Sequence, residues 1–217
     1  MQRQHLPFCE QLVQAGRELL GSGLTVETWG NISCRDPVTG NVYLTPSAMA
    51  YDRCTAADMV VFAADGTQID GRRRPSVEAA MHLSIYRARD DVQAILHTHP
   101  VYSTVFGCLG EKIPPIIDEA AQALGEPVPV TAYALPGSEQ LARNCVDALG
   151  ALGMACLLRS HGAVCCGADM AGAFKTARVL EMTAQIYYMA RAIGTPEVLP
   201  PDKVDWMRDF ALNRYRQ

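Results

Sequence analysis

The chain lacks the features of a membrane protein or a nucleic-acid-binding protein. No apolar run in its 217 residues approaches the roughly 20 residues that a membrane-spanning helix needs. The formal net charge is -4, and the basic run at residues 72–74 has no interleaved aromatic residues. The first residues lack the basic start and the apolar core of a signal peptide. We therefore expect a cytoplasmic protein whose partners include neither nucleic acid nor a membrane.

A C-x-x-C motif is also missing, although the chain contains eight cysteines. The cysteines are scattered through apolar segments, which is typical of reduced core residues rather than of a disulfide framework. The absence of C-x-x-C argues against a thioredoxin-like redox site and a structural zinc site. We expect no thiol catalysis.

No internal repeat, low-complexity segment or clear linker interrupts the chain, which predicts a single domain over residues 1–217. Hydrophobic residues make up 49% and charged residues 19%, as in ordinary globular proteins. A β-hairpin is expected within residues 27–45. The predicted helices cover 5–20, 78–89, 100–106, 138–149, 169–193 and 200–215, and further strands cover 59–62, 94–99, 128–133, 155–158 and 163–166. This alternation predicts an α/β protein.

Two histidines, His97 and His99, stand two positions apart at the end of a short apolar run. In a β-strand they would point to the same side, which is the arrangement of a pair that chelates a metal. His161 follows a second apolar strand directly and supplies a third ligand. Three imidazoles with one open position are typical of catalytic zinc sites. The alternative is that the first pair simply closes a strand.

Glu78 lies in the first turn of a predicted helix that Ser76 would cap. A carboxylate there is favoured by the helix dipole alone, but it could also be a fourth metal ligand or a general base. His82 lies one turn later on the same side, and we interpret it as a packing residue.

Short polar loops flank the predicted hairpin. Gly30 and Asn31 precede the first strand, where a backbone amide and a side-chain amide could bind an anion, and Ser47 follows the second strand. For each of these, a purely structural role in the hairpin is an equally good interpretation.

Taken together, five short motifs resemble the class II aldolase/adducin family, and within it the L-fuculose-1-phosphate aldolases. They are Gly30-Asn-Ile-Ser33, Leu44-Thr-Pro-Ser47, Pro75-Ser-Val-Glu78, His97-Thr-His99 and Ser160-His-Gly162. The resemblance implies a three-layer α/β/α sandwich around a largely antiparallel sheet. It also implies a homotetramer with active sites at the subunit interfaces.

The resemblance further implies a zinc-dependent aldolase that cleaves a short sugar 1-phosphate to dihydroxyacetone phosphate and an aldehyde. His97, His99 and His161 would bind the metal, and Glu78 would complete the site before acting as acid and base. Zn²⁺ is expected, although such ligands also accept Mn²⁺ or Co²⁺. Gly30, Asn31, Ser47 and Ser76 would bind the phosphate.

The chain departs from the family pattern in the phosphate site and in the catalytic acid. Ala48 and Val77 stand where family members have a glycine and a second serine. Asp118, beside Glu119, stands where they have a tyrosine from a neighbouring subunit. Asp118 and Glu119 are therefore expected to be acid or base residues, and Tyr215 is expected to fold over a neighbouring site.

The acidic pair leaves two other interpretations open. The same metal site could serve dehydration, epimerisation or decarboxylation of a sugar or sugar-acid phosphate. Alternatively, the chain could be a non-enzymatic scaffold like the adducin head domains, although an intact set of metal ligands argues against this.

Overall fold

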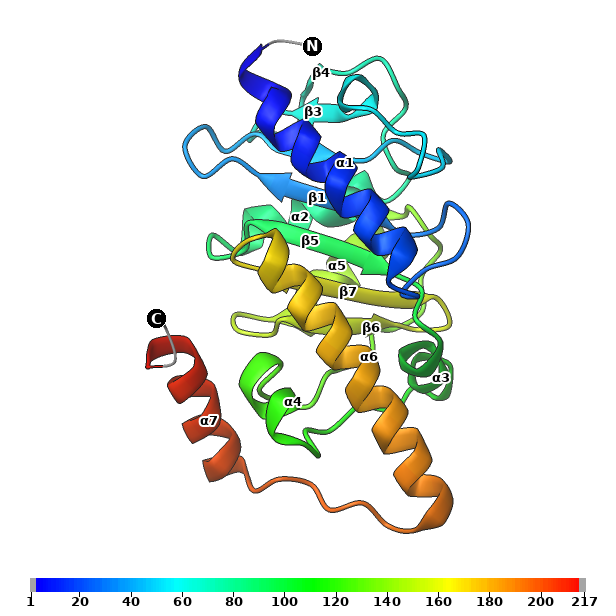
Figure 1. Cartoon of the computed structure of the whole chain (residues 1–217), viewed down its shortest axis with the longest axis vertical. Helices are drawn as coiled ribbons and strands as arrows, with labels where there is room; N and C mark the ends of the chain where they lie inside the picture. Colours follow the sequence, from blue (N-terminus) through cyan, green and yellow to red (C-terminus); the bar gives the residue numbers. More distant parts are fainter. Residues whose placement is uncertain (1–2, 215–217) are drawn as a thin grey trace.

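One seven-stranded sheet organises the chain in the computed structural model, which describes residues 3–214. Its strand order is β4-β3-β2-β1-β5-β7-β6, and every neighbouring pair is antiparallel. The strands are β1 (Asn31–Arg35), β2 (Val42–Leu44), β3 (Val60–Phe62), β4 (Gln68–Asp70), β5 (Ala94–Thr98), β6 (Ala155–Leu158) and β7 (Gly162–Gly167). The strand β5 lies between β1 and β7, near the middle of the sheet (Figure 1).

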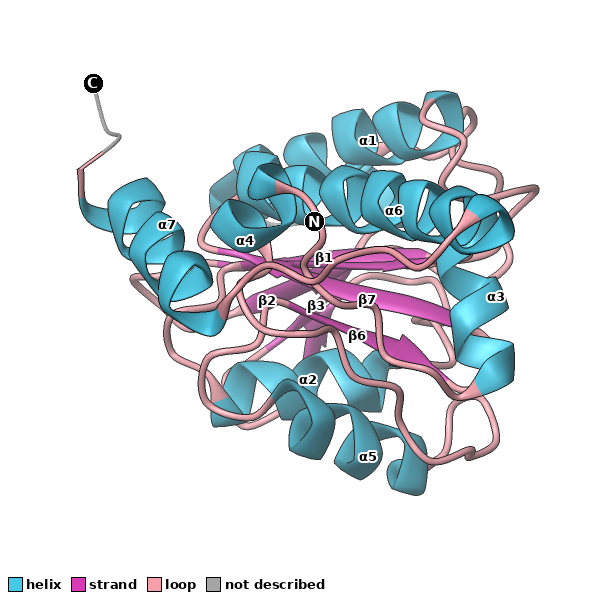
Figure 2. Ribbon diagram, turned by 90° about the horizontal axis from the view of Figure 1, so that it is seen from below, coloured by secondary structure: helices cyan, strands magenta, loops and turns pink. Residues whose placement is uncertain are grey.

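Helices cover both faces of the sheet, which confirms the predicted three-layer sandwich (Figure 2). One face carries α1 (Leu6–Gly21), α4 (Asp118–Ala123) and α6 (Met170–Ile193), and the other carries α2 (Ala79–Ala88) and α5 (Glu139–Leu149). The short helix α3 (Val101–Leu109) follows β5 at the edge of the sheet, and α7 (Pro201–Asn213) packs against α4. Two single-turn helices, η1 (Arg3–His5) and η2 (Ala56–Asp58), complete the described chain. None of the described helices combines the length and apolarity needed to cross a membrane.

Alternation along the strands divides the interior into two cores. In β5, Leu96 packs in the core beneath α1 and α6, whereas Ile95 packs in the core beneath α2 and α5. His97 therefore faces the α2 side, two residues after Ile95. All eight cysteines are free, and seven of them are buried, as expected for reduced core residues.

Some predicted elements are corrected by the structure. Residues 128–133 form isolated bridges at Val128 and Val130 instead of a strand. Pro127 and Pro129 explain the difference, because proline cannot donate a hydrogen bond to a ladder. The short helix α4 and the edge strand β4 were not predicted from the sequence. Finally, α2 is capped by Glu78 rather than by Ser76, whose hydroxyl instead accepts a hydrogen bond from the Glu78 amide at 3.2 Å.

Arg35 fastens the strand β1 to the end of α2. Its guanidinium donates to the carbonyl oxygens of Tyr86, Arg89, Asp90 and Val92 at distances between 2.7 and 3.1 Å. Its side chain is only 12% exposed. A planar guanidinium can direct several donors at once, whereas an ammonium group is a compact point charge. Arg35 therefore satisfies the Tyr86 carbonyl in the last turn of α2 and three carbonyls of the segment that follows the helix.

Replacing Arg35 with lysine keeps the charge but removes most of these hydrogen bonds. Arg35→Lys is expected to lower the free energy of unfolding by about 1 to 3 kcal/mol, because three part-buried carbonyls and one exposed carbonyl lose a charged donor. Urea unfolding measures the change, and Arg143→Lys is the control because the Arg143 side chain is 60% exposed. An unchanged midpoint for Arg35→Lys would contradict this role.

Candidate metal centre

Three histidines converge where β5 and the turn before β7 meet. His97 is the fourth residue of the buried strand β5, His99 directly follows that strand, and His161 lies in the turn between β6 and β7. Because β5 and β7 are hydrogen-bonded neighbours, these two segments end at the same place in the sheet. The ring centroids lie 4.7, 4.8 and 5.0 Å apart. One donor atom from each ring lies within 4.8 Å of the others, so the three rings form a group that could hold one ion.

The surroundings of His97 and His99 keep both imidazoles neutral. His97 is fully buried, and its Nδ1 donates to the carbonyl oxygen of Ala163 at 3.0 Å, which leaves Nε2 facing the other rings. Burial, followed by the nearby His161, lowers the pKa of His97 to about 3. Burial and His97 likewise lower the pKa of His99 to about 3. Neutral imidazole is the form that binds metal ions.

Glu78 lies against this group and is only 4% exposed. Its Oε2 lies 3.1 Å from Nε2 of His97, and its Oε1 lies 3.5 Å from Nε2 of His161. Within residues 3–214, Oε1 has no hydrogen-bond partner, and no lysine or arginine forms an ion pair with this carboxylate. A buried carboxylate without a compensating positive charge is costly.

The donor set therefore fits a divalent cation. Three neutral imidazoles and one carboxylate are the ligands that zinc accepts in proteins, and manganese and cobalt also accept them. His97, His99, His161 and Glu78 would hold the ion. Its positive charge would compensate the buried Glu78 carboxylate.

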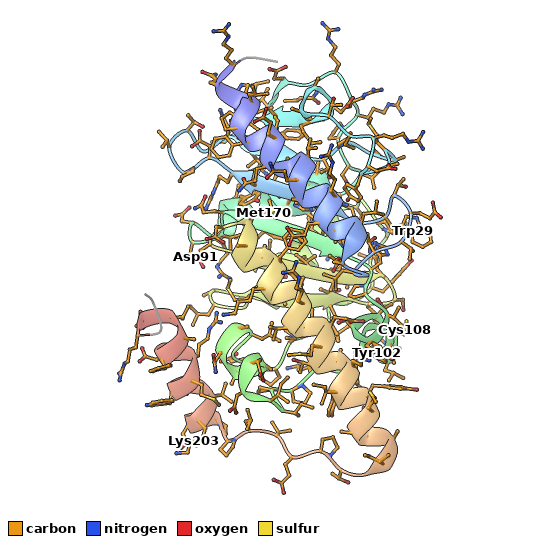
Figure 3. All side chains as sticks on the ribbon, viewed as in Figure 1. Trp29, Asp91, Tyr102, Cys108, Met170 and Lys203 are labelled. Carbon is orange, nitrogen blue, oxygen red and sulfur yellow. The ribbon has the colours of Figure 1, made fainter. Side chains whose placement is uncertain are left out.

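A cavity of about 380 Å³ gives access to these residues. Glu78, His99 and His161 line it together with Pro136 and the loops at residues 28–31, 46–48 and 76–77. Trp29, which is 57% exposed, stacks on His99 with a ring-centroid distance of 5.9 Å. Figure 3 shows Trp29 at the edge of the molecule that also carries Tyr102 and Cys108 of α3. The site is therefore open to a small molecule.

All four residues expected to bind phosphate line this cavity: Gly30, Asn31, Ser47 and Ser76. Gly30 has a φ of +78°, and a Cβ atom there would lie 2.5 Å from the carbonyl oxygen of His97, so the loop approaches β5 too closely for any side chain. The side-chain amide of Asn31 donates to Oε2 of Glu78 at 2.8 Å. Asn31 therefore contacts the candidate catalytic carboxylate as well as lining the cavity.

Both departures in the phosphate site, Ala48 and Val77, also lie in the cavity wall. Ala48 has a φ of +53°, a left-handed conformation in which glycine is favoured. Val77 is 66% exposed in place of a serine hydroxyl.

Two further predicted site residues, Asp118 and Glu119, are not brought to this cavity within the chain. Asp118 and Glu119 are exposed in the first turn of α4, and neither lines the cavity. Tyr215 lies outside the described residues. In contrast, His82 is fully buried and contacts Asn31, the partner of Glu78. Our interpretation of His82 as a packing residue missed this contact, although its spacing of four from Glu78 was visible.

Comparison with known proteins identifies the class to which this fold and site belong. The family model described as Class II Aldolase and Adducin N-terminal domain matches residues 10–188. The chain therefore belongs to the class II aldolase/adducin family, as the five motifs indicated.

Its relatives include two enzymes that act on five-carbon sugar phosphates. The chain is 36% identical to a 5-deoxy-D-ribulose 1-phosphate aldolase of Bacillus thuringiensis, over 90% of this chain and 91% of that protein. It is 34% identical to a 5-methylthioribulose-1-phosphate/5-deoxyribulose-1-phosphate aldolase of Rhodospirillum rubrum, over 89% and 86%. A solved L-fuculose 1-phosphate aldolase superposes with a TM-score of 0.90 at 34% identity, over 94% of this chain and 95% of that one.

Removing one imidazole tests the candidate metal centre. His97→Ala is expected to weaken metal binding by more than about a hundredfold. Losing a hydrogen-bond partner of a metal ligand already lowers metal affinity about 10- to 100-fold, and losing the ligand itself lowers it further. Metal content after loading and dialysis measures the effect. His5→Ala is the control, since His5 contacts Tyr43 and lies outside the group. Full metal content in His97→Ala would refute the ligand assignment.

Proposed function

We propose that this chain is a metal-dependent aldolase that cleaves a short 1-phosphoketose to dihydroxyacetone phosphate and an aldehyde. The observation that carries the proposal is the Glu78 carboxylate, which lies against His97 and His161 at the base of an open cavity. The relatives that act on 5-deoxyribulose and 5-methylthioribulose 1-phosphates support a five-carbon substrate of this kind.

The residues at the site suit this reaction. Breaking the bond between the third and fourth carbons leaves negative charge on the hydroxyketone fragment. His97, His99 and His161 would hold a divalent cation, which we propose to be Zn²⁺. When bound, this cation supplies the positive charge that stabilises the fragment. Glu78 is the group positioned to move a proton to and from the reacting carbon.

The phosphate would lie in the same cavity, beside Glu78. The amide group of Gly30 and the hydroxyls of Ser47 and Ser76 are the donors available there, with Asn31 beside them. Val77 supplies no hydroxyl, and one lost hydrogen bond to a phosphate costs about 1 to 3 kcal/mol. We therefore expect weaker phosphate binding than in family members that have a second serine.

A second copy of the chain would complete the site. We propose a homotetramer in which Asp118, Glu119 and Tyr215 serve a neighbouring cavity as acid or base residues. Two observations support this arrangement. Asp118 and Glu119 are exposed and lie away from their own cavity. In addition, α6 exposes large apolar side chains, namely Met182, Ile186, Tyr188, Met189 and Ile193, which are suited to contact another subunit.

Condensation assays distinguish an aldolase from the other reactions that this metal site could support. The metal-loaded protein is incubated with dihydroxyacetone phosphate and either acetaldehyde or methylthioacetaldehyde. An aldolase is expected to form a new carbon–carbon bond, which mass spectrometry detects as a 1-phosphoketose. Isomer exchange or loss of water from a ketose phosphate, without any condensation product, would favour epimerisation or dehydration instead.

Replacing the carboxylate of Glu78 with an amide tests its role as a base. Glu78→Gln is expected to retain most of the metal, because the three histidines remain, but to lower kcat by about 10²- to 10⁴-fold because an amide cannot accept the proton. Steady-state kinetics and metal analysis on the same sample measure both effects. Glu139→Gln, whose side chain is 87% exposed, is the control. Parental turnover in Glu78→Gln would require a different base.

A further inference from the structure

A row of polar side chains connects Glu78 to the interior between α2 and β1. Glu78 caps α2, and His82 and Tyr86 follow it at intervals of four residues. In β1, Asn31 and Ser33 are two residues apart. Alternate residues of a strand are separated by about 6.6 Å, and four residues of a helix rise about 6 Å, so the two rows remain in step. Each strand side chain can therefore lie between two helix side chains.

The hydrogen bonds follow this arrangement without a gap. Nδ2 of Asn31 lies 2.8 Å from Oε2 of Glu78, and Oδ1 of Asn31 lies 2.5 Å from Nε2 of His82. Nδ1 of His82 lies 2.6 Å from the hydroxyl of Ser33, which lies 2.9 Å from the hydroxyl of Tyr86. His82 and Ser33 are fully buried, and the other three residues are no more than 5% exposed.

The groups at the two ends of the row, Glu78 and Tyr86, determine which atom donates in each hydrogen bond. A carboxylate only accepts, so Asn31 must turn its amide nitrogen to Glu78 and its oxygen to His82. His82 must then donate from Nε2. In the neutral ring Nδ1 then carries no proton, and it accepts from the Ser33 hydroxyl at 2.6 Å. Burial raises the pKa of Tyr86 well above its usual value, which keeps its hydroxyl a donor.

We propose that His82 is a positioning residue for Glu78. As the Nε2–H tautomer, it locks the Asn31 amide so that its nitrogen faces the Glu78 carboxylate, with Ser33 and Tyr86 holding the tautomer from behind. This inference rests on the proposed role of Glu78 as the base. In residues 3–214 the His82 ring bonds to Asn31 and Ser33 and does not line the cavity, and its backbone amide donates to the Glu78 carbonyl at 3.4 Å as part of the helix.

The fixed orientation of the Asn31 amide matters because its oxygen and its NH2 group are nearly equal in shape, so the amide could rotate by half a turn without a steric clash. If Asn31 turned over, its oxygen would face the Glu78 carboxylate, and two acceptors would repel each other. Without a donor at position 82, only the carboxylate itself opposes this rotation. The carboxylate would then sample orientations that no longer present an oxygen to the reacting carbon. Hydrogen-bonded networks of this kind also strengthen one another in a poorly solvated interior.

The tautomer of His82 can be read directly, whatever reaction the protein catalyses. Protein labelled with ¹⁵N-histidine is examined by long-range ¹H–¹⁵N NMR, and the His82→Gln variant assigns the resonance among the five histidines. A neutral ring with the proton on Nε2 is expected. A proton on Nδ1, or a doubly protonated ring near neutral pH, would overturn the proposal even if the protein were a fully active aldolase.

Kinetics then test whether His82 acts through Glu78. His82→Leu removes the donor to Asn31 and is expected to lower kcat by about 10- to 100-fold, with bound metal retained and KM changed by less than about threefold. His82→Gln, which can still donate to Asn31, is expected to recover most of kcat. In a Glu78→Gln background, where the amide can pair with either end of Asn31, His82→Leu is expected to cause little further loss.

Two further variants keep the test decisive. Ser33→Ala removes one hydroxyl, so it serves if His82→Leu fails to fold, and a two- to tenfold loss of kcat is expected. Thr183→Val is the control, because it removes the hydroxyl of a buried residue that donates to the Val179 carbonyl within α6, and parental kcat is expected. The proposal would be overturned if His82→Leu lowered kcat by the same factor in the parent and in the Glu78→Gln background. It would also be overturned if His82→Leu or Ser33→Ala left kcat unchanged. An inactive parent would instead contradict the proposed function, and the NMR result would still decide the tautomer.

Discussion

The burial of one carboxylate is the constraint on which the site depends. Glu78 is almost fully buried, and the groups within ion-pair distance in residues 3–214 are the imidazoles of His97 and His161. Such a carboxylate needs a positive charge that the protein itself does not supply there. Three convergent imidazoles would solve this problem by holding a cation. The carboxylate would then lie next to that cation, which is what proton transfer beside a developing negative charge requires.

The position of β5 explains how the chain builds this arrangement from distant segments. β5 pairs with β1 on one side, where His97 lies opposite Asn31, and with β7 on the other, where the turn carries His161. Antiparallel pairing brings the end of β5 to the beginning of both neighbours. The close approach of the Gly30 loop to the carbonyl of His97 then closes one wall of the cavity.

The interface between β1 and α2 has a structural end at Arg35 and a candidate catalytic end at Glu78. Arg35 binds the end of α2 through carbonyl oxygens, and its guanidinium lies 5.2 Å from the centre of the Tyr86 ring. From Tyr86 toward Glu78, the contacts change from backbone to side-chain hydrogen bonds. Because Arg35 fixes β1 relative to α2 at one end of the interface, two hydrogen bonds suffice to define the orientation of Asn31 at the other end. Arg35 and Asn31 both belong to β1.

Local patterns in the sequence determined most of the helices and strands and the three histidines of the candidate metal centre. These features depend on periodicity and on neighbouring residues, as with His97 and His99 at the end of an apolar run. The tertiary structure decided the features that depend on contacts between distant segments. Residues 128–133 have the composition of a strand, but their prolines prevent regular pairing. His82 looks like a packing histidine until β1 places Asn31 and Ser33 against its two ring nitrogens. Spacing shows which side chains share a face, but only the packing of helix on strand shows what they meet there.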